Sequence, residues 1–265
     1  MTVTAFLPTG GLSGWTFLKR TKTAQLETFA KIPAIEREIS YFREQIENIR
    51  SAQELVSDRR LLGVSLGAFG LSDDLNNRFF IQKILEEGTA TPDALAIKLS
   101  DTRYRSLAST FGFDRTSGFA NWDPGFVENL ISRYTNQSFE EAVGQQDQEL
   151  RLSLNAQREL GDLASEDLSE KTKWYRVMGS PPLREVFEIA LGLPQSFGEW
   201  DIDKQLEIFR DKTEDLTGEK TISQFKDEAA ADLVINRYLL MSQLNNGLSL
   251  TPGQIAISLL QAATP

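Results

Sequence analysis

The chain of 265 residues contains no cysteine and no histidine. The missing thiols and imidazoles exclude disulfides, Cys/His zinc sites, Ser-His-Asp triads and the Glu-x-x-His di-iron motif. Adjacent acids occur, as at Asp73-Asp74 and Glu140-Glu141, but neighbouring residues of a helix do not face one another. We therefore expect no catalytic residue, no metal site and no cofactor. An enzyme that uses carboxylate or lysine chemistry is kept as an alternative.

The chain also lacks a surplus of basic charge and a long apolar run. It has 38 acidic and 28 basic residues, a formal net charge of −10, which repels phosphate backbones and anionic lipid surfaces. No apolar segment reaches the roughly 20 residues of a membrane span. The start does not resemble a signal peptide, because its first basic residue, Lys19, follows the apolar residues. We expect no nucleic-acid partner, no integral membrane segment and a cytoplasmic location.

Apolar residues recur at helical spacing, and no strand-like alternation of convincing length is present. The segment 58–71 is apolar on every side of a helical wheel, which indicates a core helix surrounded by partners. The segment 32–50 carries one apolar seam and a charged opposite face, so we expect it to lie on the core helix, or alternatively to dimerise through the seam. The seam consists of Ile35, Ile39, Phe42, Ile46 and Ile49. The sequence predicts an all-α, multi-helix globular bundle.

Helix ends are predicted from glycines and capping residues. Gly70, Gly112 and Gly192 are each followed by an apolar residue. This pattern is typical of a helix C-terminus at which glycine adopts the left-handed conformation. Their spacing, in units of roughly 40 residues, suggests two loosely duplicated halves at 21–120 and 121–265, divided near the loop 114–125. Predicted helix starts are Thr91-Pro92, Asp101, Ser138 with Glu141 (to about Leu163), Ser180-Pro181, Thr221 with Gln224 (to about Leu244), and Thr251-Pro252 (to Ala263).

Two segments present aromatic side chains outside the predicted helices. Residues 1–20 are interrupted by proline and glycines, and we expect an N-terminal arm without a regular element that offers Trp15 and Phe17 to a partner. The alternative is an arm packed on the protein's own core. In the loop 114–125, Phe119 and Trp122 form a second candidate partner-binding surface, or alternatively anchor the loop between two half-cores.

An ordered series of segments carries a family resemblance. The series is GGLSGWTFLKRT, Gln25, Phe29, Tyr41-Phe42, LVSDRRLLGVSLGAFGL, RFFIQKILEEGT, ALAIKLSDTRY and TFGF. It resembles a bacterial family of uncharacterised proteins whose genes tend to lie among flagellar genes, densely from about Phe6 to Phe113 and more thinly afterwards. The resemblance implies a helical, soluble protein associated with the flagellum, and it supplies no catalytic residues.

The function expected from these observations is that of a flagellum-associated accessory protein. It would act in assembly, export or as a motor accessory, through contacts with a protein partner of the flagellum. One alternative is an exported structural subunit of the flagellum, and the other is the carboxylate or lysine enzyme named above. The sequence leaves the oligomeric state open.

Overall fold

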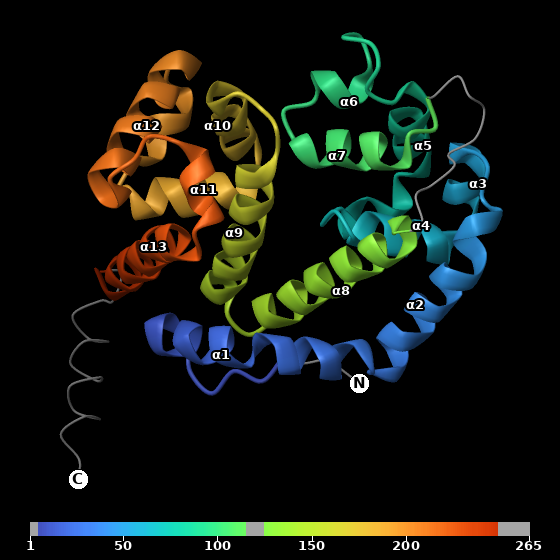
Figure 1. Cartoon of the computed structure of the whole chain (residues 1–265), viewed down its shortest axis with the longest axis horizontal. Coiled ribbons are helices and arrows are strands. Elements are labelled where there is room, and N and C mark those ends of the chain that lie inside the picture. The colour runs from blue at the N-terminus through green and yellow to red at the C-terminus, as the bar shows by residue number, and fades with distance from the viewer. Residues whose placement is uncertain (1–4, 115–124, 249–265) are drawn as a thin grey trace.

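The computed structural model describes residues 5–114 and 125–248 (Figure 1). Within these ranges every regular element is helical, which confirms the all-α prediction. The first elements are α1 Gly11–Ala30, α2 Pro33–Gln45, η1 Ile46–Asn48, α3 Ala52–Ser57, α4 Arg59–Gly67, η2 Ser72–Asn76, α5 Arg78–Glu87, α6 Leu95–Lys98 and α7 Thr102–Phe111. They are followed by α8 Phe126–Gly144, α9 Gln148–Ser165, α10 Glu170–Gly179, α11 Pro181–Ala190, η3 Gln195–Glu199, α12 Ile202–Thr217, η4 Ile222–Lys226 and α13 Glu228–Leu248.

The helices form two groups joined by long helices. Helices α2 to α7 lie on one side, and α10 to α13 lie on the other, with α8 and α9 between them (Figure 1). Helix α1 runs along α8, α9 and α13 and so contacts both sides. Most buried apolar residues of both sides belong to one continuous cluster, and Ile84, Ala96 and Ala108 form a small second cluster among α5 to α7. Of the predicted boundary loop 114–125, residues 115–124 lie outside the described residues.

Helix α4 confirms the predicted core helix. Asp58 caps it, because the side chain of Asp58 accepts hydrogen bonds from the backbone N–H groups of Arg60 and Leu61 at 2.9 and 3.0 Å. From Leu61 to Gly67 all residues but Gly63 are buried, and the helix contacts α2, α3 and α8. Burying leucine or valine fully stabilises a fold by roughly 1.5–3 kcal/mol per side chain. This helix is therefore a central part of the core.

The three predicted glycine stops are also confirmed. Gly70 has φ +67°, and the N–H of Leu71 donates to the carbonyl of Leu66 at 2.9 Å. Gly112 and Gly192 likewise have positive φ values, of 58° and 63°. Only glycine adopts this region without a Cβ clash.

Helix α2 lies on α4 through the predicted seam, with Ile35, Ile39 and Phe42 buried. The charged outer face of α2 pairs with a neighbouring helix. Arg43 pairs with Glu128 of α8, at 2.8 Å between Nε and Oε1. A carboxylate from a neighbouring helix offers the guanidinium two oxygens, a geometry stronger than a single contact along one helix.

Helix α6 begins only at Leu95, with Ala94 before it, so the start predicted at Thr91-Pro92 is misplaced. Two other predicted helix starts are wrong. Ser138 lies inside α8, and the next helix, α9, is capped by Asp147, whose Oδ1 accepts from the N–H of Leu150 at 2.9 Å. Thr221 precedes only the short η4, and α13 begins after Asp227, which accepts from the N–H of Ala229. In both places a second capping residue lies a few positions downstream. The helix predicted after Thr251 lies outside the described residues.

The N-terminal arm without a regular element is also a wrong prediction from Gly11 onward. Gly14 lies within helix α1, where a Cβ would lie 2.2 Å from the carbonyl oxygen of Thr9, so the close packing explains the glycine. Trp15 and Leu18 follow on the inner face and are buried. The arm is thus packed on the core, as the alternative predicted.

Candidate functional site

The four aromatic residues predicted to bind a partner are not brought together. Trp15 is 1% exposed and therefore presents no surface to a partner. Phe17 is half-buried and lines a groove on the outside of α1. Phe119 and Trp122 lie outside the described residues. Of the predicted set, Phe17 alone is placed by the structure at a surface hollow.

The α1 groove has a volume of about 370 Å³ and no charged residue in its lining. Phe6 stands at its edge with 66% of its surface exposed, and its ring contacts that of Phe17 edge to face at 5.7 Å. Phe29 and Phe139 close its floor with a second edge-to-face contact at 5.5 Å. The full lining is Ala5, Phe6, Phe17, Thr21, Ala24, Gln25, Thr28, Phe29, Ile32 and Phe139.

The chain before α1 builds one wall of the groove. The amide of Gln25 accepts from the N–H of Phe6 at 2.9 Å and donates to the carbonyl of Phe6 at 3.2 Å. Gln146 donates to the carbonyl of Ala5 at 2.7 Å. These three hydrogen bonds hold the backbone of Ala5 and Phe6 in place, while the Phe6 ring stays exposed to solvent. Sequence reasoning missed Phe6 as a site residue, although Gln25 belongs to the resembling series.

Three charged residues, on α1 and just after it, lie outside the lining of the α1 groove. Arg20 and Lys31 are exposed on α1 and just after it, and within the described part of the chain neither has an ion pair. Glu27 is the acidic residue on this stretch of α1. The lining of the groove is therefore uncharged and aromatic in a protein of net charge −10.

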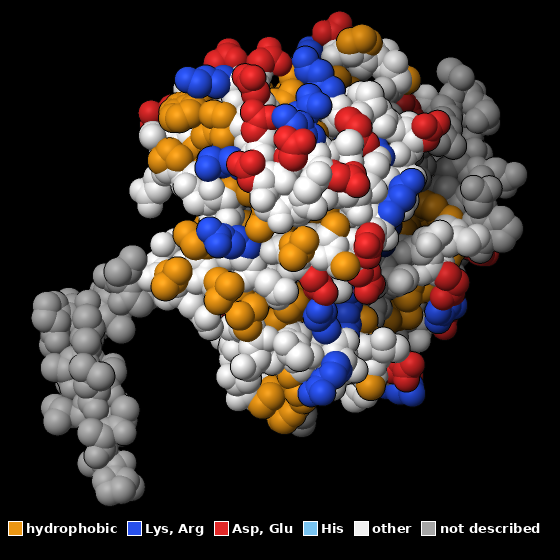
Figure 2. Space-filling model, turned by 60° about the vertical axis from the view of Figure 1, so that its left-hand side comes forward, with side chains coloured by type: hydrophobic (Ala, Val, Ile, Leu, Met, Phe, Trp, Pro, Cys, Tyr) orange, Lys and Arg blue, Asp and Glu red, His pale blue; other side chains and the backbone are white. Residues whose placement is uncertain are grey.

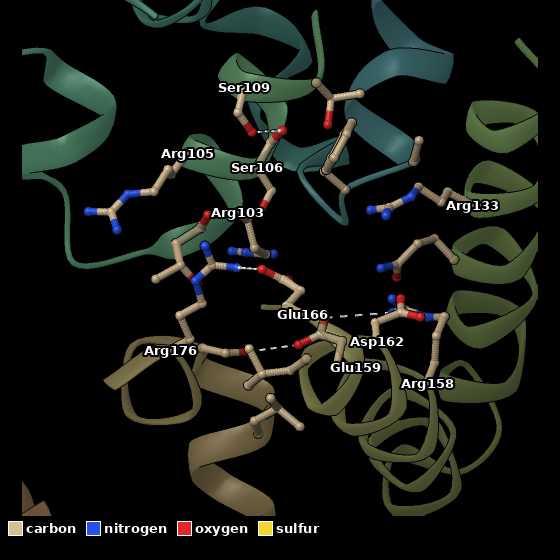
Figure 3. Close-up of a pocket in the computed structure, with 18 residues that line it drawn as sticks. Arg103, Arg105, Ser106, Ser109, Arg133, Arg158, Glu159, Asp162, Glu166 and Arg176 are labelled. Atoms are coloured by element: carbon tan, nitrogen blue, oxygen red, sulfur yellow. Dashed lines mark hydrogen bonds and ion pairs between the residues drawn. The ribbon is translucent and has the colours of Figure 1, made fainter. Parts of the chain in front are cut away.

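A second hollow, the arginine cleft, lies between α7 on one side and α8 to α11 on the other (Figure 3). Its volume is about 280 Å³. Five arginines and three acids line it, together with hydroxyl groups of α7. The charged members are Arg103, Arg105, Arg133, Arg158, Glu159, Asp162, Glu166 and Arg176. These residues come from four helices, so no local pattern in the sequence marks them.

Three arginines of the arginine cleft are each paired with a carboxylate. Arg158 binds Glu140 through two hydrogen bonds, at 2.8 and 3.1 Å. Burial lowers the pKa of Arg158, but the charge and hydrogen bonds of Glu140 outweigh burial and hold that pKa above its ordinary value. Arg176 pairs with Glu166 at 2.6 Å, and Arg103 pairs with Asp101 at 2.7 Å. The cleft therefore ties neighbouring helices together.

Two arginines of the cleft have weaker partners. Arg133 lies over the ring of Phe69, at 5.6 Å from its centre. Arg105 donates to the carbonyl of Ile97 at 3.3 Å, while its Nε is buried without a hydrogen bond among the described residues. Within the same residues, no cluster of three or more acidic side chains is arranged to hold a metal ion. No described helix has the length and apolarity to cross a membrane.

Comparisons with known proteins place this architecture in a family. A search of curated proteins returns no match. A crystal structure of a protein from Agrobacterium tumefaciens is similar, with a TM-score of 0.75 and 25% identity over 92% of this chain and 99% of that chain. A family model matches residues 68–230, so the family likeness extends well past Phe113, where the resemblance in sequence becomes thin. The chain belongs to the family described as Protein of unknown function (DUF1217).

Proposed function

We propose that this protein is an accessory protein of the flagellum that binds a protein partner in the α1 groove. The observation that carries the proposal is the groove itself, an uncharged, aromatic-lined hollow with Phe6 two-thirds exposed at its edge. Large aromatic side chains at the edge of a pocket are typical anchors of protein interfaces. The flagellar context comes from the ordered series of segments that resembles proteins encoded among flagellar genes.

The chemistry of the groove defines the partner. Its floor takes apolar side chains, since no charged group lies there to bind a polar ligand. The backbone of Phe6 is already bonded to Gln25, so the groove recognises side chains instead of adding a strand. The expected partner element is an apolar helix face.

The test compares Phe6→Asp with Phe79→Asp in capture of flagellar proteins from motile cells. Phe79 is a matched control, because it is 82% exposed and belongs to α5, outside the groove. Loss of an anchor residue costs roughly 2 kcal/mol or more of binding free energy, so Phe6→Asp should weaken capture at least about 30-fold. Equal capture by both variants would rule out the groove as the contact.

The alternative of an exported structural subunit is separated by fractionation of the same cells. An accessory protein should stay out of purified hook–basal bodies, whereas a subunit should copurify with them in fixed proportion. The enzyme alternative has one observation in its favour, the convergence of titratable groups in the arginine cleft. Against it, Arg158 and Arg176 each pair with a carboxylate there, which stabilises the anion and makes a poor proton donor.

A further inference from the structure

The segment just before α1 is held in place by side chains. Its residues 5–10 belong to no helix. The amide of Gln25 bonds both backbone groups of Phe6, and Gln146, in the turn after α8, bonds the carbonyl of Ala5. Figure 2 shows hydrophobic side chains exposed at the lower edge of the molecule, the side along which α1 and this segment lie in Figure 1. The position of Phe6 therefore depends on glutamine side chains from two other elements.

The orientation of the Gln25 amide is fixed from within α1. Phe17, Thr21 and Gln25 follow one another at intervals of four residues, so they lie on one face of the helix. The hydroxyl of Thr21 donates its one hydrogen to the carbonyl of Phe17 at 3.0 Å. Toward Gln25 this hydroxyl can only accept, and it accepts from Nε2 at 2.9 Å. The amide oxygen of Gln25 is thereby turned toward the N–H of Phe6.

The hydrogen-bonding groups of the Gln25 amide are engaged within the protein. Nε2 donates to Thr21 at 2.9 Å and to the carbonyl of Phe6 at 3.2 Å, and Oε1 accepts from the N–H of Phe6 at 2.9 Å. Both hydrogens of the amide are used, so neither is left for a molecule in the groove. Gln25 can therefore affect binding chiefly through Phe6, whose ring contacts that of Phe17.

We propose that Gln25, oriented by Thr21, is a positioning residue that holds Phe6 in its binding position before the partner arrives. This inference rests on the proposed function of the α1 groove. A side chain that is already ordered loses less conformational freedom on binding than a mobile one. Without the two hydrogen bonds of Gln25, the partner would have to order the backbone of Phe6 itself. Loss of these bonds should weaken binding about tenfold.

The first test needs no partner and compares Gln25→Met with Gln82→Met in the full chain. Methionine has no group that can replace the amide in these bonds. Gln82 is a matched control, because it is equally half-buried and bonds Glu86 on α5, outside the groove. Exchange of the Phe6 amide hydrogen, followed by NMR, should be about tenfold faster in Gln25→Met and unchanged in Gln82→Met. Unchanged exchange in Gln25→Met would overturn the proposal.

The second test is a double-mutant cycle on the capture of flagellar proteins from motile cells. Gln25→Met should weaken capture about tenfold when Phe6 is present. It should have no further effect in a Phe6→Ala background, because a residue that acts through Phe6 has nothing left to position. Equal losses in both backgrounds would show that Gln25 contacts the partner directly, and would overturn its positioning role.

The same cycle separates failure of this inference from failure of the proposed function. If Phe6→Ala weakens capture and Gln25→Met does not, the positioning role is wrong and the groove remains the partner surface. If Phe6→Ala leaves capture unchanged, the proposed function is contradicted, and the positioning role with it.

Discussion

The α1 groove and the arginine cleft are both hollows of a few hundred Å³, but the groove is lined by uncharged residues and the cleft by many charged ones. In the cleft, buried charges face one another across neighbouring helices, as in the pair of Arg158 and Glu140. In the groove, apolar ring atoms are exposed to solvent, as at Phe6. Charges that are already paired gain little from a ligand, whereas exposed aromatic surface gains by being covered. The cleft should therefore govern stability, and the groove should govern binding.

The largest effect is expected at Arg158. Its side chain is 17% exposed and that of Glu140 is 6% exposed, so Arg158→Ala leaves a carboxylate buried without its partner. Breaking a buried pair in this way costs roughly 3–5 kcal/mol, and urea unfolding should show a free energy lower by that amount. Replacing the pair as Arg158→Met with Glu140→Leu is the control and should recover most of the loss. A drop below about 1 kcal/mol in the single variant would show that the cleft does not hold the helices together.

A medium effect is expected at Asp58, which makes its polar contacts among helices α2 to α7. Asp58 caps α4 and accepts a hydrogen bond from the hydroxyl of Tyr41 at 2.6 Å. Loss of a cap costs about 0.5–2 kcal/mol, so Asp58→Ala should lower the free energy of unfolding within that range at pH 7. Asp93→Ala is a control, since Asp93 is an exposed acid that caps no helix of the structure.

The effect of Asp58 should depend on pH with a defined sign. Burial raises the pKa of Asp58, but hydrogen bonds from Tyr41 and from two backbone amides prevail and lower it below its ordinary value. Since the unfolded pKa is about 3.9, the stabilisation is present above about pH 4 and is lost as pH falls through the folded pKa. The difference between wild type and Asp58→Ala should shrink in acid, and a constant difference from pH 7 to pH 2 would contradict this account.

A smaller effect is expected for the pair of Arg43 and Glu128, which has the chemistry of the cleft without its burial. Its side chains are 50% and 62% exposed, and exposed pairs contribute about 0.2–1 kcal/mol. Arg43→Ala should therefore change the free energy of unfolding by no more than that, and the change should decline in 1 M salt, where the Debye length is about 3 Å. If Arg43→Ala lowered the free energy of unfolding as much as Arg158→Ala, burial could not explain why one ion pair stabilises the fold more than the other.

The smallest effect on stability is expected in the groove. Phe6 is exposed and precedes α1, and exposed positions usually change the free energy of unfolding by about 0.5 kcal/mol or less. Phe6→Ala should fall in that range by urea unfolding and still weaken partner capture. A large loss of stability would mean that Phe6 supports the fold, and the contrast between groove and cleft would fail.

The sequence predicted those parts of the fold whose causes are local. Helix α4, the seam of α2 and the stop at Gly70 depend on periodicity and on the backbone freedom of glycine, which neighbours in the chain reveal. Helix α1 was not predicted because Gly14 resembles a helix breaker in the sequence. In the structure this glycine leaves room for the carbonyl oxygen of Thr9. The start of α9 was misplaced because Ser138 and Asp147 both resemble caps.

The candidate site was predictable only in part, for the same reason. Phe17 stands out as an aromatic residue near the N-terminus, but its partner Phe6 is held by Gln25, 19 residues further along the chain. The arginine cleft gathers side chains from Arg103 to Arg176. Such groupings depend on how helices pack, which a single sequence does not encode in a readable pattern.

The most direct test of the central claim, that the α1 groove is the partner surface, is photo-crosslinking in motile cells. A photoreactive phenylalanine analogue would replace Phe6 in one strain and the exposed Phe79 in another. We expect the position of Phe6 to yield a crosslink to a flagellar protein and the position of Phe79 to yield none. Crosslinks from Phe79 alone, or from neither position while the protein still copurifies with its partner, would contradict the claim.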